Sequence, residues 1–285
     1  MKFGFVAKHR GVWPVAMQCE ALGVSRSGFY AWGRRPQSTR ARIDAEILQT
    51  IRASFVLSDS TYGVRRMIDD VRDAGHVCGR DRVARLMRAA ALRARPRRRA
   101  RPSDTGVRAM IAPNVLDRAF TATAPNQKWV ADFTYVWSSE GWLFVAAVID
   151  LFSRRVVGWS MQETMASALV TDALMMAVWR RGPADALLHH SDQGSQYTSE
   201  EFQRLLDGLG VTCSMSRSGN CWDNAVMESF FSTMKTERCH RRHYATREIA
   251  RADIFDYIER FYNPTRRHST LGNKSPLSFE RAAVA

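Results

Sequence analysis

The pattern of apolar and polar positions divides this 285-residue chain into a helical first part and a second part in which strands and helices are mixed. Three runs in the second part are rich in aromatic and β-branched residues, which predicts consecutive strands at residues 128–137, 142–149 and 154–161. The run 142–149 is nearly continuous in apolar residues, as in a strand buried on both faces. Helical and strand patterns then alternate, with helices expected at 166–179, at 199–209, in the later part of 219–237 and at 247–262, and strands at 186–190 and 211–215. Together these elements predict an α/β fold, a mixed sheet with helices on both faces.

The first part of the chain shows helical patterns. A helix at residues 15–22 and a second one that Ser25 would cap and that runs to Trp32 have the form of a helix-turn-helix. Ser25 and Arg26 would begin the second helix, where such motifs contact DNA. Three more helices are expected, at residues 43–54, 62–74 and 81–92.

Charge is distributed unevenly along the chain. Residues 1–127 contain 24 Lys and Arg against 10 Asp and Glu, whereas residues 128–285 contain 18 of each. The first part therefore has the electrostatics of a polyanion binder. Six arginines without an intervening acid predict an arm that binds phosphates with little sequence preference: Arg93, Arg95, Arg97, Arg98, Arg99 and Arg101. Four prolines in residues 93–127 indicate a linker between two domains.

Composition excludes several classes of protein. The longest apolar run, residues 142–152, is interrupted by Asp150 and is too short to span a membrane. Five cysteines without a CxxC pair argue against a disulfide framework and against a structural zinc site. The first eight residues have too short an apolar centre for a signal peptide. We therefore expect a cytoplasmic protein with no membrane partner.

Two aspartates lie at positions that suggest a functional role for a carboxylate. Asp132 falls within the first predicted strand, and an ionised carboxylate there is costly unless it is paired or binds a cation. Asp192 follows the short strand 186–190, and ligand sites of open α/β sheets gather beyond such strand ends. A turn or helix-cap role explains Asp192 equally well.

A third acid lies in the helix that follows residue 219. Glu228 shares a helix face with Asn224 and Lys235, at offsets of four and seven. An ordinary solvated face is the simpler interpretation of these residues alone. Asp150 and Asp223 are expected to be structural, Asp150 in a turn and Asp223 in the first turn of this helix.

Four motifs, in chain order, carry a resemblance: Trp129-Val-Ala-Asp-Phe-Thr-Tyr135, Val148-Ile-Asp-Leu-Phe-Ser-Arg154, His190-Ser-Asp-Gln-Gly-Ser-Gln-Tyr197 and Asn224-Ala-Val-Met-Glu-Ser-Phe-Phe231. They resemble the integrase-type core of bacterial insertion-sequence transposases, and in particular the second reading-frame product (OrfB) of the insertion sequence three family. The segments 23–32 and 262–272 fit the same family. The resemblance covers nearly the whole chain.

The resemblance implies a site and a domain plan. The family's catalytic Asp, Asp, Glu triad falls on Asp132, Asp192 and Glu228, with 35 residues between the last two. The family's basic residue falls on Lys235, which is expected to contact DNA. The implied plan is a helix-turn-helix DNA-binding region at residues 1–92, a basic linker at 93–127, and a ribonuclease H-like catalytic core with a helical extension at 128–285.

The implied activity is DNA transposition. Three carboxylates would hold two Mg²⁺ ions, for which Mn²⁺ could substitute, and strand cleavage at the element ends would precede strand transfer. The expected partners are DNA, further copies of the chain on DNA, and an upstream OrfA-type product or fusion. Arg266, Arg267 and His268 are further candidate DNA contacts. Two alternatives stay open: a structure-selective ribonuclease H-like endonuclease that cuts without joining, and a non-catalytic DNA-binding regulator.

Overall fold

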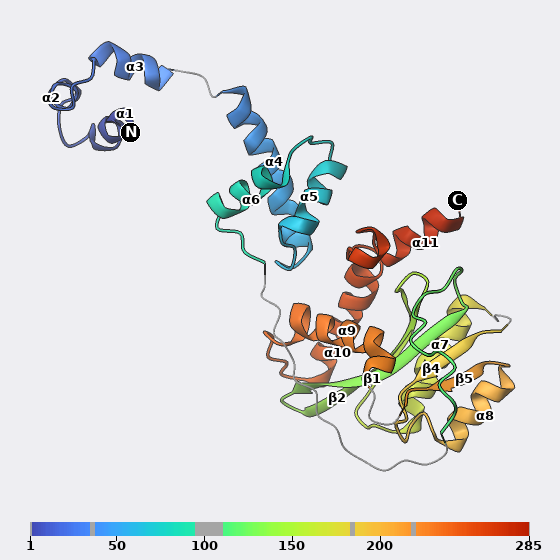
Figure 1. Cartoon of the computed structure of the whole chain (residues 1–285). Helices are drawn as coiled ribbons and strands as arrows, with labels where there is room; N and C mark the ends of the chain where they lie inside the picture. The colour runs from blue at the N-terminus through green and yellow to red at the C-terminus, as the bar shows by residue number, and fades with distance from the viewer. Residues whose placement is uncertain (1, 35–37, 95–110, 183–185, 218–220, 285) are drawn as a thin grey trace.

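The computed structural model describes residues 2–34, 38–94, 111–182, 186–217 and 221–284. Figure 1 shows three parts: helices α1–α3 standing apart, helices α4–α6, and a sheet with the remaining helices around it. The helices of the first two parts are α1 (Lys2–His9), α2 (Val15–Ala21), α3 (Arg26–Arg34), α4 (Thr39–Leu57), α5 (Val64–Asp73) and α6 (Arg80–Ala89). Those of the third are α7 (Ser167–Arg181), α8 (Glu200–Gly208), α9 (Ala225–Met234), α10 (Arg247–Asp256) and α11 (Pro276–Val284).

Five strands form one mixed sheet in the order β3-β2-β1-β4-β5. The first three strands are antiparallel neighbours, while β4 runs parallel to β1 and β5 parallel to β4. The strands are β1 (Lys128–Ser138), β2 (Gly141–Asp150), β3 (Val156–Gln162), β4 (Leu188–Ser191) and β5 (Thr212–Met215). The predicted mixed α/β sheet is confirmed, and each predicted strand lies within a few residues of its place.

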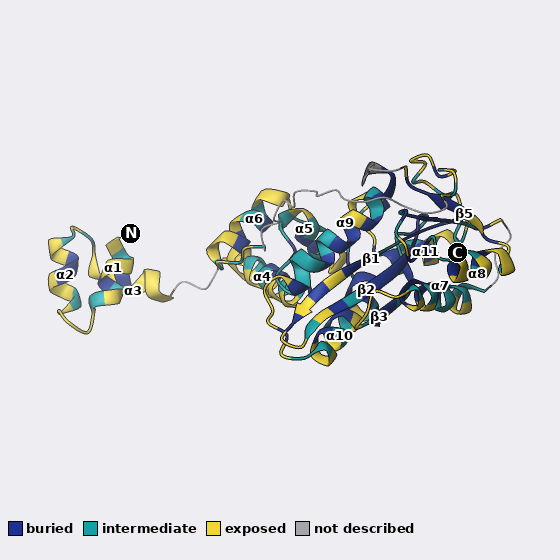
Figure 2. Cartoon of the chain, turned by 90° about the horizontal axis from the view of Figure 1, so that it is seen from below, coloured by how far each residue is buried: buried dark blue, intermediate teal, exposed yellow. Residues whose placement is uncertain are grey.

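The two faces of the sheet belong to two apolar cores. On one face Trp129 of β1 packs with Leu169 of α7. On the other, Val130 packs with Phe230 of α9. Alternate residues of β1 point to opposite faces, so Asp132 shares its face with Val130 and looks toward α9. Figure 2 shows burial concentrated in the sheet and its covering helices, whereas α1–α3 are largely exposed around a small core of their own.

Helices α4–α6 dock on the C-terminal extension of the core. Met67 of α5 belongs to the same apolar cluster as α9 and α10. The buried Tyr62 hydroxyl donates to the carbonyl oxygen of Thr265 at 3.2 Å and accepts from the backbone N–H of Arg267 at 2.9 Å. The Arg267 guanidinium donates to Asp70 at 2.7 Å. Polar and apolar contacts therefore join helices α4–α6 to the part of the molecule that contains the sheet.

The same contacts bear on one expectation. Arg266 is only 6 % exposed, and its guanidinium donates to both carboxylate oxygens of Glu237 at 2.7 and 2.8 Å. His268 packs edge-to-face on Tyr262, with ring centroids 4.9 Å apart. These ion pairs and this packing give Arg266, Arg267 and His268 structural partners, and their contact with DNA stays a prediction.

The segment that precedes the sheet also differs from expectation. Within the predicted linker 93–127, the described residues from 111 onward lie on the core. Leu116 is 1 % exposed within an apolar cluster, and the backbone N–H groups of Val115 and Leu116 donate to the Ser214 hydroxyl. Arg93 is exposed, whereas Arg95, Arg97, Arg98, Arg99 and Arg101 lie outside the described residues.

Some elements were not foreseen. Neither α1 nor α11 is predicted by the pattern of apolar and polar residues. Two predicted helices continue beyond their α-helical part as π-helical turns, η2 (Lys235–Cys239) after α9 and η3 (Tyr257–Tyr262) after α10. A π turn takes up extra residues per turn, and no local residue type announces it. No helix in the described part of the chain is long and apolar enough to cross a membrane.

Candidate active site

Asp132 and Asp192 are brought together by strand register. In the parallel pair of β1 and β4, Val130 lies opposite His190. Asp132 and Asp192 each come two residues later, so they stand side by side just beyond the end of the pairing. Asp132 accepts a hydrogen bond from the backbone N–H of Phe133, and Asp192 accepts one from that of Gly194, each at 2.8 Å.

Glu228 comes from the first turn of α9. The apolar side of this helix, which carries Phe230, Phe231 and Met234, is buried. Asn224, just before the helix, donates from its side-chain amide to the carbonyl oxygen of Ala131 at 3.2 Å. This bond ties the start of the helix to the strand residue that precedes Asp132. The side chain of Glu228 itself is exposed.

The pKa shifts of the acids show that their charges interact. Burial first, and then the negative charges of Asp192 and Glu228, raise the pKa of Asp132 well above its usual value. The N–H of Phe133 and the charge of Lys235 act in the opposite direction. Burial also raises the pKa of Glu228. Asp132 therefore lies in the field of both other acids, and Asp192 acts on it more strongly than Glu228.

Oxygen ligands of this kind suit a hard divalent cation. The three carboxylates bring negative charge into a partly buried place, which a cation would neutralise. Among the described residues, however, no three His, Cys, Asp or Glu side chains are already grouped closely enough to form a metal site. The donor chemistry therefore fits such an ion, and Glu228, the exposed member, is the side chain that would have to approach the two aspartates.

Two residues beside the acids were not singled out as ligands and are structural. Tyr197 is 1 % exposed; burial, and then the charges of Asp132 and Asp192, raise its pKa well above the usual value. His190 pairs through its two ring nitrogens with the hydroxyls of Ser214 and Ser216, at 2.8 and 3.2 Å. These contacts fix the strand ends behind Asp192.

Asp223 has a different role from the one expected of a residue in a first helical turn. It lies in the 3-10 turn η1 (Cys221–Asn224) and is fully buried. It accepts hydrogen bonds from the side chains of Arg118 and Asn114, each at 2.9 Å, and from the N–H of Arg217 at 3.1 Å. Burial alone would raise the pKa of Asp223, but these donors lower it. Asp223 thus anchors residues 114–118 beside α9. Residues 218–220, part of the loop that leads to α9, lie outside the described residues.

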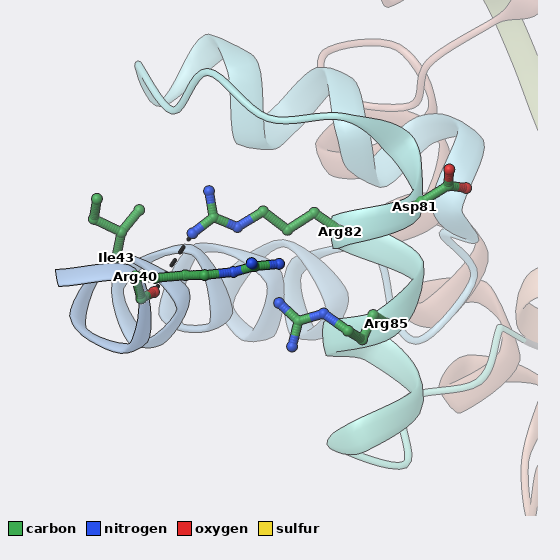
Figure 3. Close-up of a pocket in the computed structure, with 5 residues that line it drawn as sticks. All are labelled: Arg40, Ile43, Asp81, Arg82 and Arg85. Carbon is green, nitrogen blue, oxygen red and sulfur yellow. Dashed lines mark hydrogen bonds between the residues drawn. The ribbon is translucent and has the colours of Figure 1, made fainter. Parts of the chain in front are cut away.

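The helical parts contain a second basic surface besides the arm. Figure 3 shows Arg40 of α4 with Arg82 and Arg85 of α6 around a hollow of about 470 Å³. Asp44 accepts hydrogen bonds from Arg82 and Arg85, each at 2.7 Å. The hydrogen bond from Arg85, and then that from Arg82, lower the pKa of Asp44. In α3, the Ser25 hydroxyl accepts from the N–H of Gly28 at 3.0 Å, which is the expected helix cap.

Comparison with known proteins supports this architecture. A family described as "Integrase core domain" matches residues 122–221, a second family of the same description matches 209–276, and an "HTH-like domain" family matches 42–100. The helix-turn-helix form expected at residues 15–32 lies outside that last range, and it stays a prediction.

Two relatives match over almost their whole length. The transposase InsF for insertion sequence IS3A of Escherichia coli (strain K12) is 41 % identical over 288 residues, covering all of both chains. The insertion element IS600 uncharacterized 31 kDa protein of Shigella sonnei is 42 % identical over 262 residues, covering 92 % of this chain and 96 % of its own.

Solved structures show only a distant likeness. The intasome of simian T-cell lymphotropic virus, in complex with a PP2A regulatory subunit, gives a TM-score of 0.46 at 16 % identity, covering 73 % of this chain and 68 % of that chain. The HTLV-2 integrase catalytic core domain in complex with magnesium (trimeric form) gives a TM-score of 0.43 at 16 % identity, covering 55 % of this chain and 98 % of that chain. These values carry no argument about the chemistry.

The sheet order, the helices around it and the integrase-core matches define a DNA-transposing enzyme with a ribonuclease H-like core and helical DNA-binding parts. The full-length identity to the InsF transposases is more specific. The chain belongs to the IS3 family of insertion-sequence transposases.

Proposed function

We propose that Asp132, Asp192 and Glu228 are the catalytic acids of this transposase. The observation that carries the proposal is the parallel register of Val130 with His190, which sets the two aspartates side by side on neighbouring strands. The Asn224 amide, bonded to Ala131, holds the helix of Glu228 against the same strand.

The three carboxylates would bind two Mg²⁺ ions, and Mn²⁺ could replace them. When bound, such a pair stabilises the attacking and leaving oxygens of an in-line displacement. The sheet holds the backbone of Asp132 and Asp192. Hydrogen bonds from the N–H groups of Phe133 and Gly194 fix one oxygen of each carboxylate. Glu228 would complete the set from the helix.

Two displacements make up the reaction. Water attacks the phosphodiester at the element end, the P–O3′ bond breaks, and the element keeps a 3′-hydroxyl. That hydroxyl then attacks a target phosphodiester, so that a new P–O3′ bond forms and a target 3′-hydroxyl leaves. Water is the nucleophile of the first step and the DNA 3′-hydroxyl that of the second, so no covalent protein–DNA intermediate is required.

The DNA would lie along the basic parts of the chain. We propose phosphate contacts for Lys235, Arg26 and the arginine arm that begins at Arg93, and for Arg40 beside the pair Arg82 and Arg85. Ser25 would lie at the same DNA surface. The protein would act on bacterial DNA in the cytoplasm as a homo-oligomer, with an OrfA-type product as partner or fusion.

The test is strand cleavage of element-end DNA with Mg²⁺. Asp132→Asn, Asp192→Asn and Glu228→Gln should each lower the cleavage rate by about 10³-fold or more, because catalytic groups that act as a unit fail together. DNA binding should be kept. Glu248→Gln, an exposed acid on α10, is the matched control and should cleave normally.

Products separate the alternatives. Normal cleavage by all three variants would end the proposal. Cleavage without any strand-transfer product would indicate a structure-selective endonuclease. Binding without cleavage by the unaltered protein would indicate a DNA-binding regulator.

A further inference from the structure

Three large aromatic side chains stand exposed at the end of the β1–β2 hairpin. Tyr135 is 52 % exposed, Trp137 56 % and Trp142 44 %. On the opposite face of the same hairpin, Val136 and Leu143 are buried in the core. The hairpin thus has a packed face and an aromatic face. A contiguous group of exposed aromatic rings marks an interaction surface more often than chance exposure.

The rings are ordered relative to one another. Trp137 and Trp142 are cross-strand partners, with ring centroids 4.7 Å apart and planes at 72°. Tyr135 and Trp142 are 4.9 Å apart, with planes at 75°. Trp142 therefore stands edge-to-face between the other two rings. Because this arrangement is already formed, a flat ligand that stacks on Trp137 or Tyr135 loses little additional conformational freedom of the protein.

Cationic side chains border the rings. The Lys235 ammonium group lies 4.7 Å from the centre of the Tyr135 ring. A hollow of about 320 Å³ is lined by the three aromatic residues together with Lys235, Arg242 and His243. Arg242 is paired with Asp253 and Asp59, so Lys235 is the more available cation. Aromatic faces beside positive charge suit a ligand made of flat rings on a negatively charged backbone.

The aromatic surface lies near the candidate active site, although the rings and Asp132 point to opposite faces of β1. Tyr135 follows Asp132 by three residues on the same strand, which is about 10 Å along it. Lys235 connects the two places, because its ammonium group lies over the Tyr135 ring and its charge acts on Asp132. Lys235 follows Glu228 by seven residues on the continuous helix of α9 and η2. A DNA strand with a phosphate at the three acids therefore reaches this hairpin within a few nucleotides.

We propose that Tyr135, Trp137 and Trp142 form a stacking surface for unpaired bases of the DNA strand next to the cleaved phosphodiester, with Lys235 on its phosphates. This inference rests on the proposed function for its location. Binding at this surface would not depend on the base sequence, because every base has a π-face that can stack on an aromatic ring. It would hold the separated end of the element while the acids act on the backbone.

Binding by the full-length protein without divalent metal tests this inference. The probes are a blunt duplex and the same duplex with a five-nucleotide single-stranded thymidine extension. Trp137→Ala should weaken binding of the extended probe by about fivefold to a hundredfold and leave the blunt probe within about twofold. Trp137→Tyr, which keeps a stacking ring, should bind nearly as well as the unaltered protein. Trp179→Ala, which removes a 78 % exposed ring of α7, is the matched control and should change neither probe.

Two further readouts separate stacking from charge. A 2-aminopurine in the extension should be quenched by the unaltered protein and by Trp137→Tyr, but not by Trp137→Ala. Lys235→Ala should lower the slope of log affinity against log salt for the extended probe by about 0.7, whereas Trp137→Ala should leave it unchanged.

Two results would overturn the proposal. Equal loss on both probes would show that the rings do not distinguish unpaired bases. Loss of self-association in Trp137→Ala, measured by sedimentation with DNA binding unchanged, would assign the surface to a second copy of the chain. No cleavage is needed for these measurements, so their outcome is independent of the test of the three acids.

Discussion

Two groups of acids in this molecule have opposite surroundings. In the first, Arg181 donates to Asp150 at 3.2 Å and to Glu280 at 2.8 and 3.0 Å. Arg155 donates to Glu280 at 2.8 Å, and so does the Ser153 hydroxyl at 2.7 Å. Burial by itself would raise the pKa of Glu280, but these donors bring it below the usual value. This group fastens α11 to the turn between β2 and β3.

In the second group, Asp132 and Asp192 receive hydrogen bonds from backbone N–H groups. Within the described residues, no arginine pairs with either of them or with Glu228, and the pKa of Asp132 rises where that of Glu280 falls. Burial raises the pKa of Asp150 as well, although backbone N–H groups and Arg181 act against it, so the contrast in pKa lies between Asp132 and Glu280. The arginine ion pairs make the first group a structural element. The second group has no arginine partner in the described part of the chain, which fits the proposed catalytic acids, and the crowding of its carboxyls costs stability.

The largest effect on stability is expected in the first group. Glu280→Gln should lower the free energy of unfolding by about 3 kcal/mol, because it removes the carboxylate that pairs with the largely buried Arg181 and the half-buried Arg155. Urea unfolding at pH 7 measures this change. The matched control is Glu248→Gln, whose pair with Arg251 is exposed, and it should cost no more than about 0.5 kcal/mol.

The pH dependence of that effect follows from the lowered pKa of Glu280. A carboxyl whose pKa is lower in the folded state stabilises the fold above its unfolded value, near 4.5. This stabilisation is lost as the pH falls through the folded value. The difference between the unaltered protein and Glu280→Gln should therefore shrink below about pH 4.5. A difference of the same size at pH 3 and pH 7 would contradict the ion-pair explanation.

The second group should respond in the opposite direction. Asp132→Asn should raise the free energy of unfolding by about 1 kcal/mol in EDTA, because it removes a carboxylate that is crowded by burial and by two like charges. Mg²⁺ should raise the melting temperature of the unaltered protein more than that of the variant, because a ligand of the folded state stabilises by mass action.

Thermal unfolding with and without Mg²⁺ measures both effects of Asp132→Asn. Asp207→Asn, an exposed acid at the end of α8, is the control and should show neither. If Asp132→Asn were less stable than the unaltered protein in EDTA, the two groups of acids would not differ as described.

Sequence patterns separated these acids only in part. Local context predicted structural roles for Asp150 and Asp223, but a turn or helix-cap role explained Asp192 equally well, and the resemblance to the transposase family selected Asp132, Asp192 and Glu228. What distinguishes Asp150 and Asp223 is a set of arginine partners 31 and 105 residues away in the chain. Such partners become neighbours only through the fold.

The elements themselves were largely predictable, because strands and helices follow local periodicity. Where sequence patterns fell short, the reason was again a partner that is distant in the sequence. Arg267, a candidate DNA contact, pairs in the fold with Asp70, which lies 197 residues earlier in the chain. Residues 111–127 have a linker composition, but Leu116 and Arg118 find partners on the core.

A buried histidine extends the comparison from acids to a base. Glu237 neutralises Arg266, and the Arg266 guanidinium lies 3.4 Å from the ring nitrogen Nε2 of His268. Burial, and then the charges of Arg266, Arg66 and Arg154, lower the pKa of His268 to about 2. The imidazole is therefore neutral in the fold and can accept from Arg266.

A histidine whose pKa is lower in the folded state stabilises the fold above its unfolded value, near 6.5, and this stability is lost as the pH falls. His268 should contribute up to about 1.4 kcal/mol per pH unit between pH 6 and 4. His268→Gln keeps an acceptor for Arg266 but cannot charge, so its free energy of unfolding should fall less steeply over this range in urea titrations. If the slope of the free energy of unfolding against pH were unchanged in His268→Gln, the His268 ring would already carry its proton beside Arg266. Glu237 would then compensate the charge of the histidine as well as that of the Arg266 guanidinium.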